Sequence, residues 1–271
     1  MKKQKVIKPQ IVKEEKDRHY YHRLLDKEEV LATFQGYIYK PNEYITLDKV
    51  EGEINAINTL GKDFFKMCQA ENLIVIVNNS PNLPERKEIP DLMFEQEFKL
   101  KMHQVHYALD LKEFEYKPVK TSPFVFKSMD TLDEEFFKNL LYSSADGDPL
   151  LGVHSPTNPD GFLEHSKDYP TYNPSHWLLA YLNNKPVGFI LANINPKYEP
   201  NVTGHMEYFS ILPEFRKQGF GAQLHYYAMS YLKKLGAVIY QGNTSTENKG
   251  MIRLLEKSGC KTTAESFFFN N

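Results

Sequence analysis

Residues 209–221 read Phe-Ser-Ile-Leu-Pro-Glu-Phe-Arg-Lys-Gln-Gly-Phe-Gly, and this stretch decides the fold of the chain. An alternating strand ends at Pro213, and apolar residues at helical spacing follow until Gly236, which is typical of a helix-ending glycine. Gly219 and Gly221 stand where that helix begins. Glycines let a ligand approach the main chain closely, and the helix N-terminus favours negative charge. The stretch therefore predicts a cradle for a phosphate or pyrophosphate.

Two better-known phosphate motifs do not fit this stretch. The third small residue of a dinucleotide-binding fingerprint would fall at Leu224, and no Gly-Lys-Ser/Thr follows as in a P-loop. Arg216 and Lys217 add formal positive charge to the cradle. Taken alone, the hexapeptide 216–221 is equally well interpreted as a glycine-containing turn without a ligand.

The wider stretch resembles the acetyl-CoA-binding motif of the GNAT superfamily of N-acetyltransferases. That motif reads apolar, x, apolar, x, Pro, x, aromatic, Arg, x, x, Gly, x, Gly or Ala, and every position matches. A second GNAT signature follows at the expected distance, with Asn248, Met251 and a helix end at Gly259. The resemblance covers about residues 124–269. It implies an α/β protein with a mixed sheet and a GNAT fold in the C-terminal half.

The resemblance also implies acetyl-CoA as the co-substrate, without a metal. Backbone groups of Phe209 and Ile211 would bind the pantetheine arm, and Asn248 would contact the cofactor, with Asn243 as a weaker candidate. The backbone amides that would hold the pyrophosphate belong to Arg216, Lys217, Gln218, Gly219, Phe220, Gly221 and Ala222.

The reaction implied is attack of an amine on the acetyl thioester, which needs a base for the ammonium proton. Period-two alternation predicts that His205 and Glu207 share a face with Phe209 and Ile211. Glu207 is the first choice for the base and His205 the second, and a solvated strand end is the plain alternative for both. Many family members carry a tyrosine as thiolate acid where this chain has Leu255.

Three local patterns around the motif predict further structure. Two apolar runs flank Asn183-Asn184, which favours an antiparallel hairpin. The run 237–240 is expected to be a strand, and a capping box from Thr244 to Glu247 predicts a helix that starts near Ser245.

The acceptor is expected near the segment 143–174, whose prolines and glycines predict a long irregular loop. Its acidic and aromatic residues would suit the mouth of a site for a cationic amine, although an exposed loop that is polar for solubility explains them as well. These residues are Asp146, Asp148, Asp160, Glu164, His165, Asp168, Tyr169, Tyr172 and Trp177.

The N-terminal half predicts a small α/β domain. A helix is expected over 53–69, a buried strand over 73–77, and two strands or a hairpin over 94–111. This order follows the back half of a GNAT domain, but no paired glycines form a cradle. It is interpreted as a degenerate GNAT-like unit or, nearly as well, as a simple α/β cap. The predicted division is 1–116, a linker at 117–123, and 124–271.

Composition limits the location and the partners. Thirty-three Lys and Arg against 35 Asp and Glu give a net charge of −2, so no bulk attraction to nucleic acid or an anionic membrane is expected. Two cysteines are too few for a disulfide framework, which favours the cytoplasm. No apolar run is long enough to span a membrane. The lysine-rich residues 1–16 are expected to be a solvated arm that orders, if at all, by lying on the rest of the protein. A homodimer is left open.

These observations favour a cytoplasmic N-acetyltransferase that acts on the primary amine of a small molecule. Two other classes stay open. One is a non-catalytic acyl-CoA-binding or sensing module, favoured by Leu255 and by the single strand expected after the last helix. The other is a protein N-acetyltransferase, for which a groove is expected in place of a pocket.

Overall fold

The computed structural model describes residues 9–40, 44–79, 88–115, 124–145, 156–196 and 201–271. The chain forms two compact units. Unit 1 consists of Met1–Val105 and Thr263–Asn271, and unit 2 of His106–Thr262. The predicted linker lies outside the described residues. Among the residues that are described, no helix is both long and apolar enough to cross a membrane.

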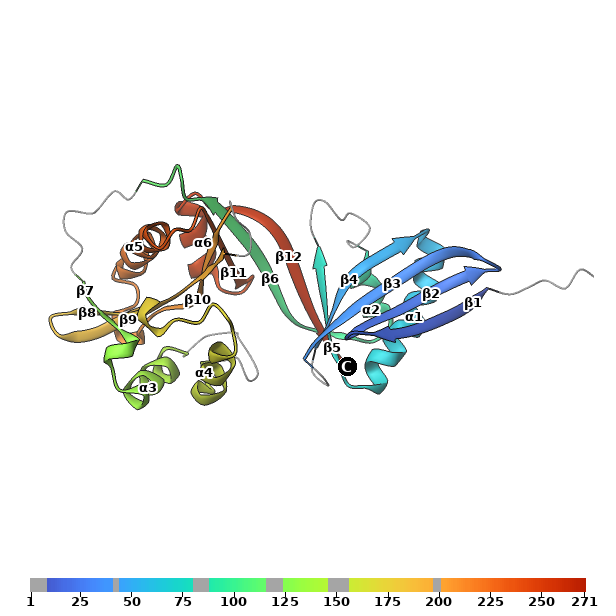
Figure 1. Ribbon diagram of the computed structural model, residues 1–271, viewed down its shortest axis with the longest axis horizontal. Coiled ribbons are helices and arrows are strands. Elements are labelled where there is room, and N and C mark those ends of the chain that lie inside the picture. Colours follow the sequence, from blue (N-terminus) through green and yellow to red (C-terminus); the bar gives the residue numbers. More distant parts are fainter. Residues whose placement is uncertain (1–8, 41–43, 80–87, 116–123, 146–155, 197–200) are drawn as a thin grey trace, which may run out of the picture. The chain divides into compact units, whose positions relative to one another are not determined.

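Unit 1 is a sheet covered by helices on one face (Figure 1). Its strands lie in the order β1-β2-β3-β4-β5-β12. Strands β1 to β4 pair antiparallel, and β5 runs parallel to β4. The elements in chain order are β1 (Gln10–Lys16), β2 (His19–Asp26), β3 (Glu29–Lys40), β4 (Tyr44–Gly52), α1 (Ile54–Ala70), β5 (Ile74–Asn79), α2 (Ile89–Glu95) and β6 (Lys99–Asp110).

The apolar face of α1 fills the core of unit 1. Phe64 and Phe65 have no exposed surface and pack their rings against Phe34 of β3, with centroids 5.5 and 5.9 Å away. Large aromatic side chains bury much apolar area each, so they dominate the stability of a small unit. The predicted helix and buried strand are therefore confirmed.

One expectation for unit 1 is wrong. Residues 94–111 do not form two strands or a hairpin, because the chain ends α2 at Glu95 and then runs through one long strand, β6. Pro90 lies in the first turn of α2, where the missing N–H of proline has no partner to lose. The described part of the N-terminal arm is ordered by lying on the rest of the unit, as expected if it orders at all: β1 is an exposed edge strand that pairs along its length with β2.

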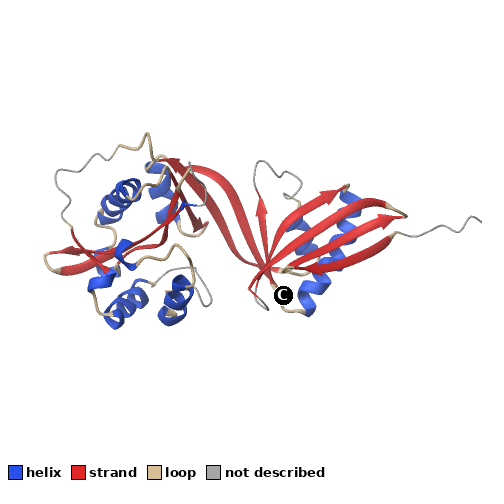
Figure 2. Ribbon diagram, in the orientation of Figure 1, coloured by secondary structure: helices blue, strands red, loops and turns tan. Residues whose placement is uncertain are grey.

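Unit 2 places its strands between two pairs of helices (Figures 1 and 2). Strand β6 lies beside β11, and the order continues β10-β9-β8-β7. The elements are β7 (Val125–Ser128), α3 (Glu134–Ser144), α4 (Pro159–Lys167), β8 (Trp177–Leu182), β9 (Lys185–Asn195), β10 (Thr203–Ile211), α5 (Phe220–Lys234), β11 (Ile239–Ser245), α6 (Lys249–Lys257) and β12 (Lys261–Asn270). Helices α3 and α4 cover one face, and α5 and α6 the other.

Local chemistry explains several of these boundaries. Asn183 and Asn184 both adopt positive φ, 51° and 64°, as the tight turn of the predicted β8–β9 hairpin requires. Gly236 follows α5 with φ 100°, so the predicted helix-ending glycine is confirmed. The predicted capping box is wrong, because β11 continues to Ser245 and Asn248 caps α6 through a 3.0 Å bond from the Met251 amide.

The two units repeat one order of elements and exchange their last strands. In unit 1, β4 leads through α1 to the parallel strand β5, as β10 leads through α5 to β11 in unit 2. The strand after α6, β12, pairs antiparallel with β5 of unit 1. The end of the strand after α2, β6, lies beside β11, and the Leu111 amide donates to the Val238 carbonyl at 2.8 Å. The single strand expected after the last helix is confirmed, and β6 takes the place of a second one.

Candidate functional site

Strands β10 and β11 separate soon after they meet. Their parallel pairing consists of Thr203 with Ile239 and Gly204 with Tyr240, although both strands continue for several residues. In unit 1, the corresponding pair β4 and β5 stays in register over four residue pairs. The later part of β10, which contains Phe209 and Ile211, is therefore not paired with its parallel neighbour β11. This is the splayed gap in which the resemblance puts the pantetheine arm.

The loop after β10 is held by Arg216. Its Nε donates to the Ile211 carbonyl at 2.9 Å, and its Nη2 donates to the Ser144 carbonyl at the end of α3 at 2.7 Å. The side chain thus fixes the loop between β10 and α5. Lys217 and Gly219 adopt left-handed φ of 61° and 83°, a change of backbone hand that turns successive amides toward one side.

Helix α5 begins without a side-chain cap, since its N-cap is Gly219. The first amides of any α-helix lack partners within the helix, so an uncapped start is suited to an anion. Packing does not require glycine at Gly219 or Gly221, the two glycines at the start of α5. A Cβ on Gly219 would meet nothing within 4 Å, and one on Gly221 would meet only Ile211 Cγ1 at 3.8 Å. The space beside the main chain at these two glycines would allow a ligand to approach the backbone closely.

Unit 1 lacks this cradle in its described residues. Helix α1 starts directly after β4, and its N-cap is the acidic Glu53, which would repel an anion. Gly52 is needed for packing, because a Cβ there would lie 2.4 Å from the Leu31 carbonyl oxygen and its φ is 125°. The described part of unit 1 therefore contains the GNAT-like order of elements without a glycine-containing, open helix start like that of α5.

A β-bulge in β10 changes the predicted faces of the strand. Met206 pairs with Ala192 and Tyr208 with Leu191, so Glu207 is the extra residue. His205 and Glu207 do share a face, with His205 Nε2 3.5 Å from Glu207 Oε2. Phe209 does not share it: its ring packs on His225 of α5. The expectation that Phe209 and Ile211 lie on the same face as the two acid–base candidates is wrong, because the bulge shifts the alternation by one residue.

Glu207 lies toward α3 and α4. The next residue, Tyr208, packs against Phe162 of α4. Glu207 Oε2 accepts a 3.2 Å bond from Nδ2 of Asn193 on β9, and 19% of the Glu207 side chain is exposed. His205 is 38% exposed. A partly buried carboxylate with a fixed donor and a route to solvent can accept a proton from a bound amine.

On the other face, a buried histidine lies beneath the gap. His225 has no exposed surface, and its ring meets Phe209 of β10 and Tyr240 of β11 edge-on, at 5.5 and 6.0 Å between centroids. Burial lowers the pKa of His225 to about 4, so the imidazole is neutral. Burial also raises the pKa of Tyr240.

The remaining cofactor candidates lie around α6. Asn243 is exposed on β11, inside the strand and not at its end. Asn248 caps α6, because its Oδ1 accepts the bond from the Met251 amide. Its Nδ2 group can still donate to a ligand. Leu255, at the position of the family's acid tyrosine, has no exposed surface.

The expected acceptor loop contains ordered structure, which corrects its interpretation as irregular. Residues 146–155, with Asp146 and Asp148, lie outside the described part. Helix α4 follows, begun by Asn158 as N-cap and Pro159 in the first turn. Asp160 pairs with Lys138 at 2.8 Å, and His165 Nε2 lies 2.8 Å from the Tyr169 hydroxyl. Much of the loop's polarity is thus engaged within unit 2.

Trp177, expected at the mouth of the acceptor site, is instead core. It has no exposed surface and packs among Phe137, Phe162 and Tyr172, with ring centroids 5.0 to 6.2 Å away. Its Nε1 donates to Asn193 Oδ1 at 3.4 Å. Asn193 was missed by sequence reasoning, since a lone asparagine in an apolar strand gives no signal without its cross-strand neighbours.

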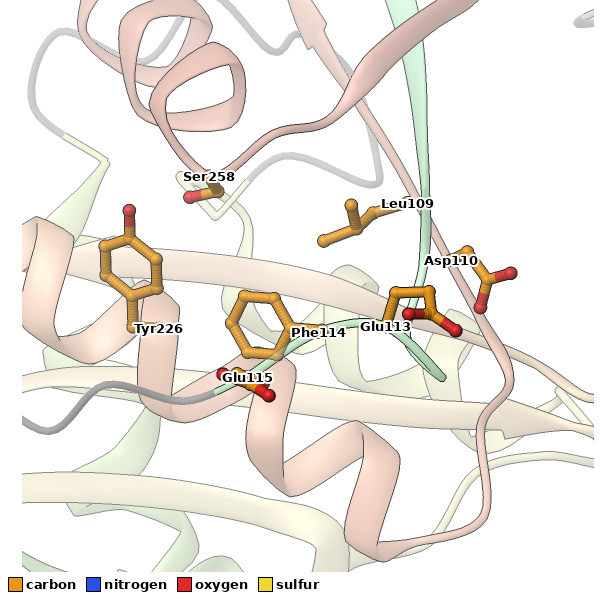
Figure 3. A pocket seen from close by; sticks show the side chains of 7 residues that line it. All are labelled: Leu109, Asp110, Glu113, Phe114, Glu115, Tyr226 and Ser258. Carbon is orange, nitrogen blue, oxygen red and sulfur yellow. The ribbon is translucent and has the colours of Figure 1, made fainter.

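A pocket of about 480 Å³ lies elsewhere in unit 2, at the ends of β6 and α6 and against α5 (Figure 3). Its walls include Phe114 and Tyr226, whose rings stack at 6.1 Å. None of the predicted site residues lines it, and its carboxylates would repel a pyrophosphate. The lining residues are Leu109, Asp110, Glu113, Phe114, Glu115, Tyr226 and Ser258. This pocket is therefore not the predicted cofactor site.

Comparisons with known proteins agree with the geometry of unit 2. Residues 144–260 match the acetyltransferase (GNAT) family. A stretch of 85 residues is 32% identical to an uncharacterized N-acetyltransferase of Methanocaldococcus jannaschii, over 31% of this chain and 38% of that protein. The chain thus spans well under half the length of this relative.

Two solved structures extend the likeness to the whole chain. A GCN5-related N-acetyltransferase from Sphaerobacter thermophilus has a TM-score of 0.64 at 11% identity, over 94% of this chain and 80% of that one. A tandem GNAT protein from the clavulanic acid biosynthesis pathway has a TM-score of 0.56 at 12% identity, over 93% and 82%. At such identities the likeness concerns the fold alone. Residues 144–260 of this chain therefore resemble the GNAT acetyltransferase family, and the chain has the same mixed α/β fold as these GNAT structures.

Proposed function

We propose that this protein binds acetyl-CoA in unit 2 and transfers the acetyl group to the primary amine of a small molecule. The observation that carries the proposal is the start of α5. This helix start has no side-chain cap, and Gly219 there is left-handed. Space is open at Gly221, beside the part of β10 that does not pair with β11. A pyrophosphate would accept hydrogen bonds from the amides of this stretch, Lys217 to Ala222, whereas the Arg216 amide already donates to the Pro213 carbonyl at 3.2 Å.

The rest of the cofactor would follow the separated strands. Backbone groups of Phe209 and Ile211 would hold the pantetheine arm, with Asn248 and Asn243 toward its other side. The Ile211 carbonyl already accepts from Arg216, so its amide is the group we assign to the ligand or to the developing oxyanion. No metal is part of the proposal.

In the proposed reaction the amine nitrogen attacks the thioester carbonyl. The C–N bond forms, the C–S bond breaks, and CoA leaves as a thiolate that takes a proton from solvent. Glu207, or His205 beside it, accepts the ammonium proton directly or through water. The exposed part of each side chain provides the route by which that proton leaves.

A non-catalytic acyl-CoA-binding role is the second candidate, favoured by the buried Leu255. It predicts cofactor binding without turnover. We further propose that the N-terminal half, residues 1–116, is a non-catalytic, degenerate GNAT-like domain, joined by the linker 117–123 to the acetyltransferase half, 124–271. Residues 263–271 of that second half then complete the sheet of unit 1. We also propose a cytoplasmic location, since both Cys68 and Cys260 are free thiols and buried.

Two measurements on the full chain test the function. Calorimetric titration with CoA should show binding, and release of free thiol from acetyl-CoA should require an added amine. A panel of polyamines, amino sugars, amino acids and lysine peptides would identify the acceptor class. Binding without thiol release from any amine would support the sensing role, and no binding would contradict both.

A further inference from the structure

We propose that Asn193 is a positioning residue, which holds the Glu207 carboxylate in one orientation through an amide that Trp177 locks. This inference rests on the proposed function, since it assigns Asn193 to the base of that reaction. It concerns three side chains on the neighbouring strands β8, β9 and β10.

The three side chains form a continuous polar line in an apolar core. Trp177 Nε1 donates to Asn193 Oδ1 at 3.4 Å, and Asn193 Nδ2 donates to Glu207 Oε2 at 3.2 Å. Trp177 is 0% and Asn193 2% exposed, so the bond between them is shielded from water, and the bond from Asn193 to Glu207 is partly buried. A buried asparagine beside fully apolar neighbours is costly unless its amide is bonded, and here both ends are.

The chemistry of the partners fixes which way the amide points. An indole Nε1–H can only donate, and an ionised carboxylate can only accept. The amide oxygen must therefore face Trp177 and the NH₂ must face Glu207. A flipped amide would put its NH₂ against the indole N–H and its oxygen against the carboxylate. Trp177 thus gives Asn193 a single orientation.

That orientation leaves the two oxygens of Glu207 in different environments. Both Asn193 Nδ2 and His205 Nε2 approach Oε2. Among the described residues, none bonds to Oε1 of Glu207. Of the two contacts, that of Asn193 is shielded from solvent, whereas His205 is partly exposed. Asn193 therefore anchors one oxygen, and the other is presented to the acceptor amine or to a bridging water.

A purely structural role makes a different prediction. If Asn193 served only to satisfy the indole of Trp177, any acceptor of the same size would replace it. Asn193→Asp keeps an acceptor for Trp177 and removes the donor to Glu207. We expect this variant to lower kcat by roughly 10- to 100-fold, as a displaced reacting group does, with KM for acetyl-CoA unchanged. Wild-type kcat in Asn193→Asp would overturn the proposal.

A double-mutant cycle adds a second criterion. Asn193→Leu and Glu207→Gln should each reduce kcat, but Asn193→Leu should cost less than about twofold once Glu207 is already Gln, because residues that act through one another are not additive. Losses that multiply would show that Asn193 acts independently of Glu207, and would contradict the proposal.

A spectroscopic measurement decides the same point without turnover. Trp177 is the only tryptophan, so its indole N–H gives one NMR cross peak of its kind. Glu207→Gln should shift that peak when Asn193 is present, and should not shift it in the Asn193→Leu background. An equal shift in both backgrounds, or none in either, would overturn the proposal. Absence of acetyl transfer, by contrast, would count against the proposed function while the peak still reports on Asn193.

Discussion

His225 Nδ1 lies 3.0 Å from the Oγ of Ser258, and both side chains are buried between α5 and the end of α6. Ser258 uses its single proton to donate to the Leu254 carbonyl at 2.9 Å. Nδ1 must therefore carry the imidazole proton and donate to Ser258. Nε2 is then an acceptor, and it has no hydrogen-bond partner among the described residues.

This arrangement makes stability depend on pH. Burial lowers the pKa of His225 to about 4, against an ordinary value of 6.5, so the folded state binds fewer protons than the unfolded state between these values. The contribution of the neutral imidazole is complete above pH 6.5 and is lost as the pH falls toward 4. At about 1.4 kcal/mol per pKa unit, the loss should amount to a few kcal/mol.

His225→Phe isolates that contribution, because it keeps an aromatic ring against Phe209 and Tyr240. In denaturant titrations, the unfolding free energy of the wild type should fall relative to that of the variant as the pH is lowered from 6.5 to 4. Parallel stability curves over this range would show that His225 does not titrate as inferred.

Gly221 offers the test of the cradle. A Cβ there would meet only Ile211 Cγ1, at 3.8 Å, so we expect the fold to tolerate a valine whose side chain blocks the pyrophosphate. We expect Gly221→Val to abolish CoA binding in calorimetry. Ser230→Val, on the same helix α5, introduces the same β-branched side chain away from the cradle and should bind CoA normally. Normal binding by Gly221→Val would remove the cradle assignment.

Glu207→Gln tests the base. If Glu207 accepts the ammonium proton, kcat should fall by roughly 10²–10⁴, the usual value of a positioned proton transfer. Acetyl-CoA affinity should hardly change, because the cofactor is assigned to backbone groups. Steady-state kinetics with Glu247→Gln, an exposed carboxylate before α6, provides the control. Full activity in Glu207→Gln would show that Glu207 is not the base, and that His205 or water accepts the ammonium proton.

The backbone turn before α5, to which we assign the cradle, could be predicted from the sequence because its geometry is local. Pro213, Gly219 and Gly221 each restrict or permit backbone angles within a few residues, and the helix that follows is ended by Gly236 through the same kind of local rule. Helix α4 had a local signal too, Asn158 followed by Pro159, but in a proline-rich segment these residues were interpreted as breakers rather than as a helix start.

Other features depend on pairing across the sheet and left no local trace. The bulge at Glu207 exists only in the register of β10 against β9, so strict alternation put Phe209 on the wrong face. Likewise β12 follows α6 in the chain but pairs with β5, whose residues lie far away in sequence. Asn193 acquires its meaning only from Trp177 and Glu207 on either side of it.

Leu255 leads to the last prediction, on the leaving thiolate. It occupies the position where the resemblance expects an acid tyrosine, and it has no exposed surface. A tyrosine there would overpack a filled core, at a cost of about 1–3 kcal/mol, and bury its hydroxyl. We expect Leu255→Tyr to lower the unfolding temperature without raising the rate, and Leu255→Met, of similar volume, to retain both. Without a phenol as acid, the wild-type rate of acetyl transfer should rise with pH as the amine loses its proton, and should show no fall near pH ~10, where a phenol titrates. A bell-shaped wild-type profile, or a faster Leu255→Tyr, would show that a tyrosine acid does operate or can be accommodated at this site.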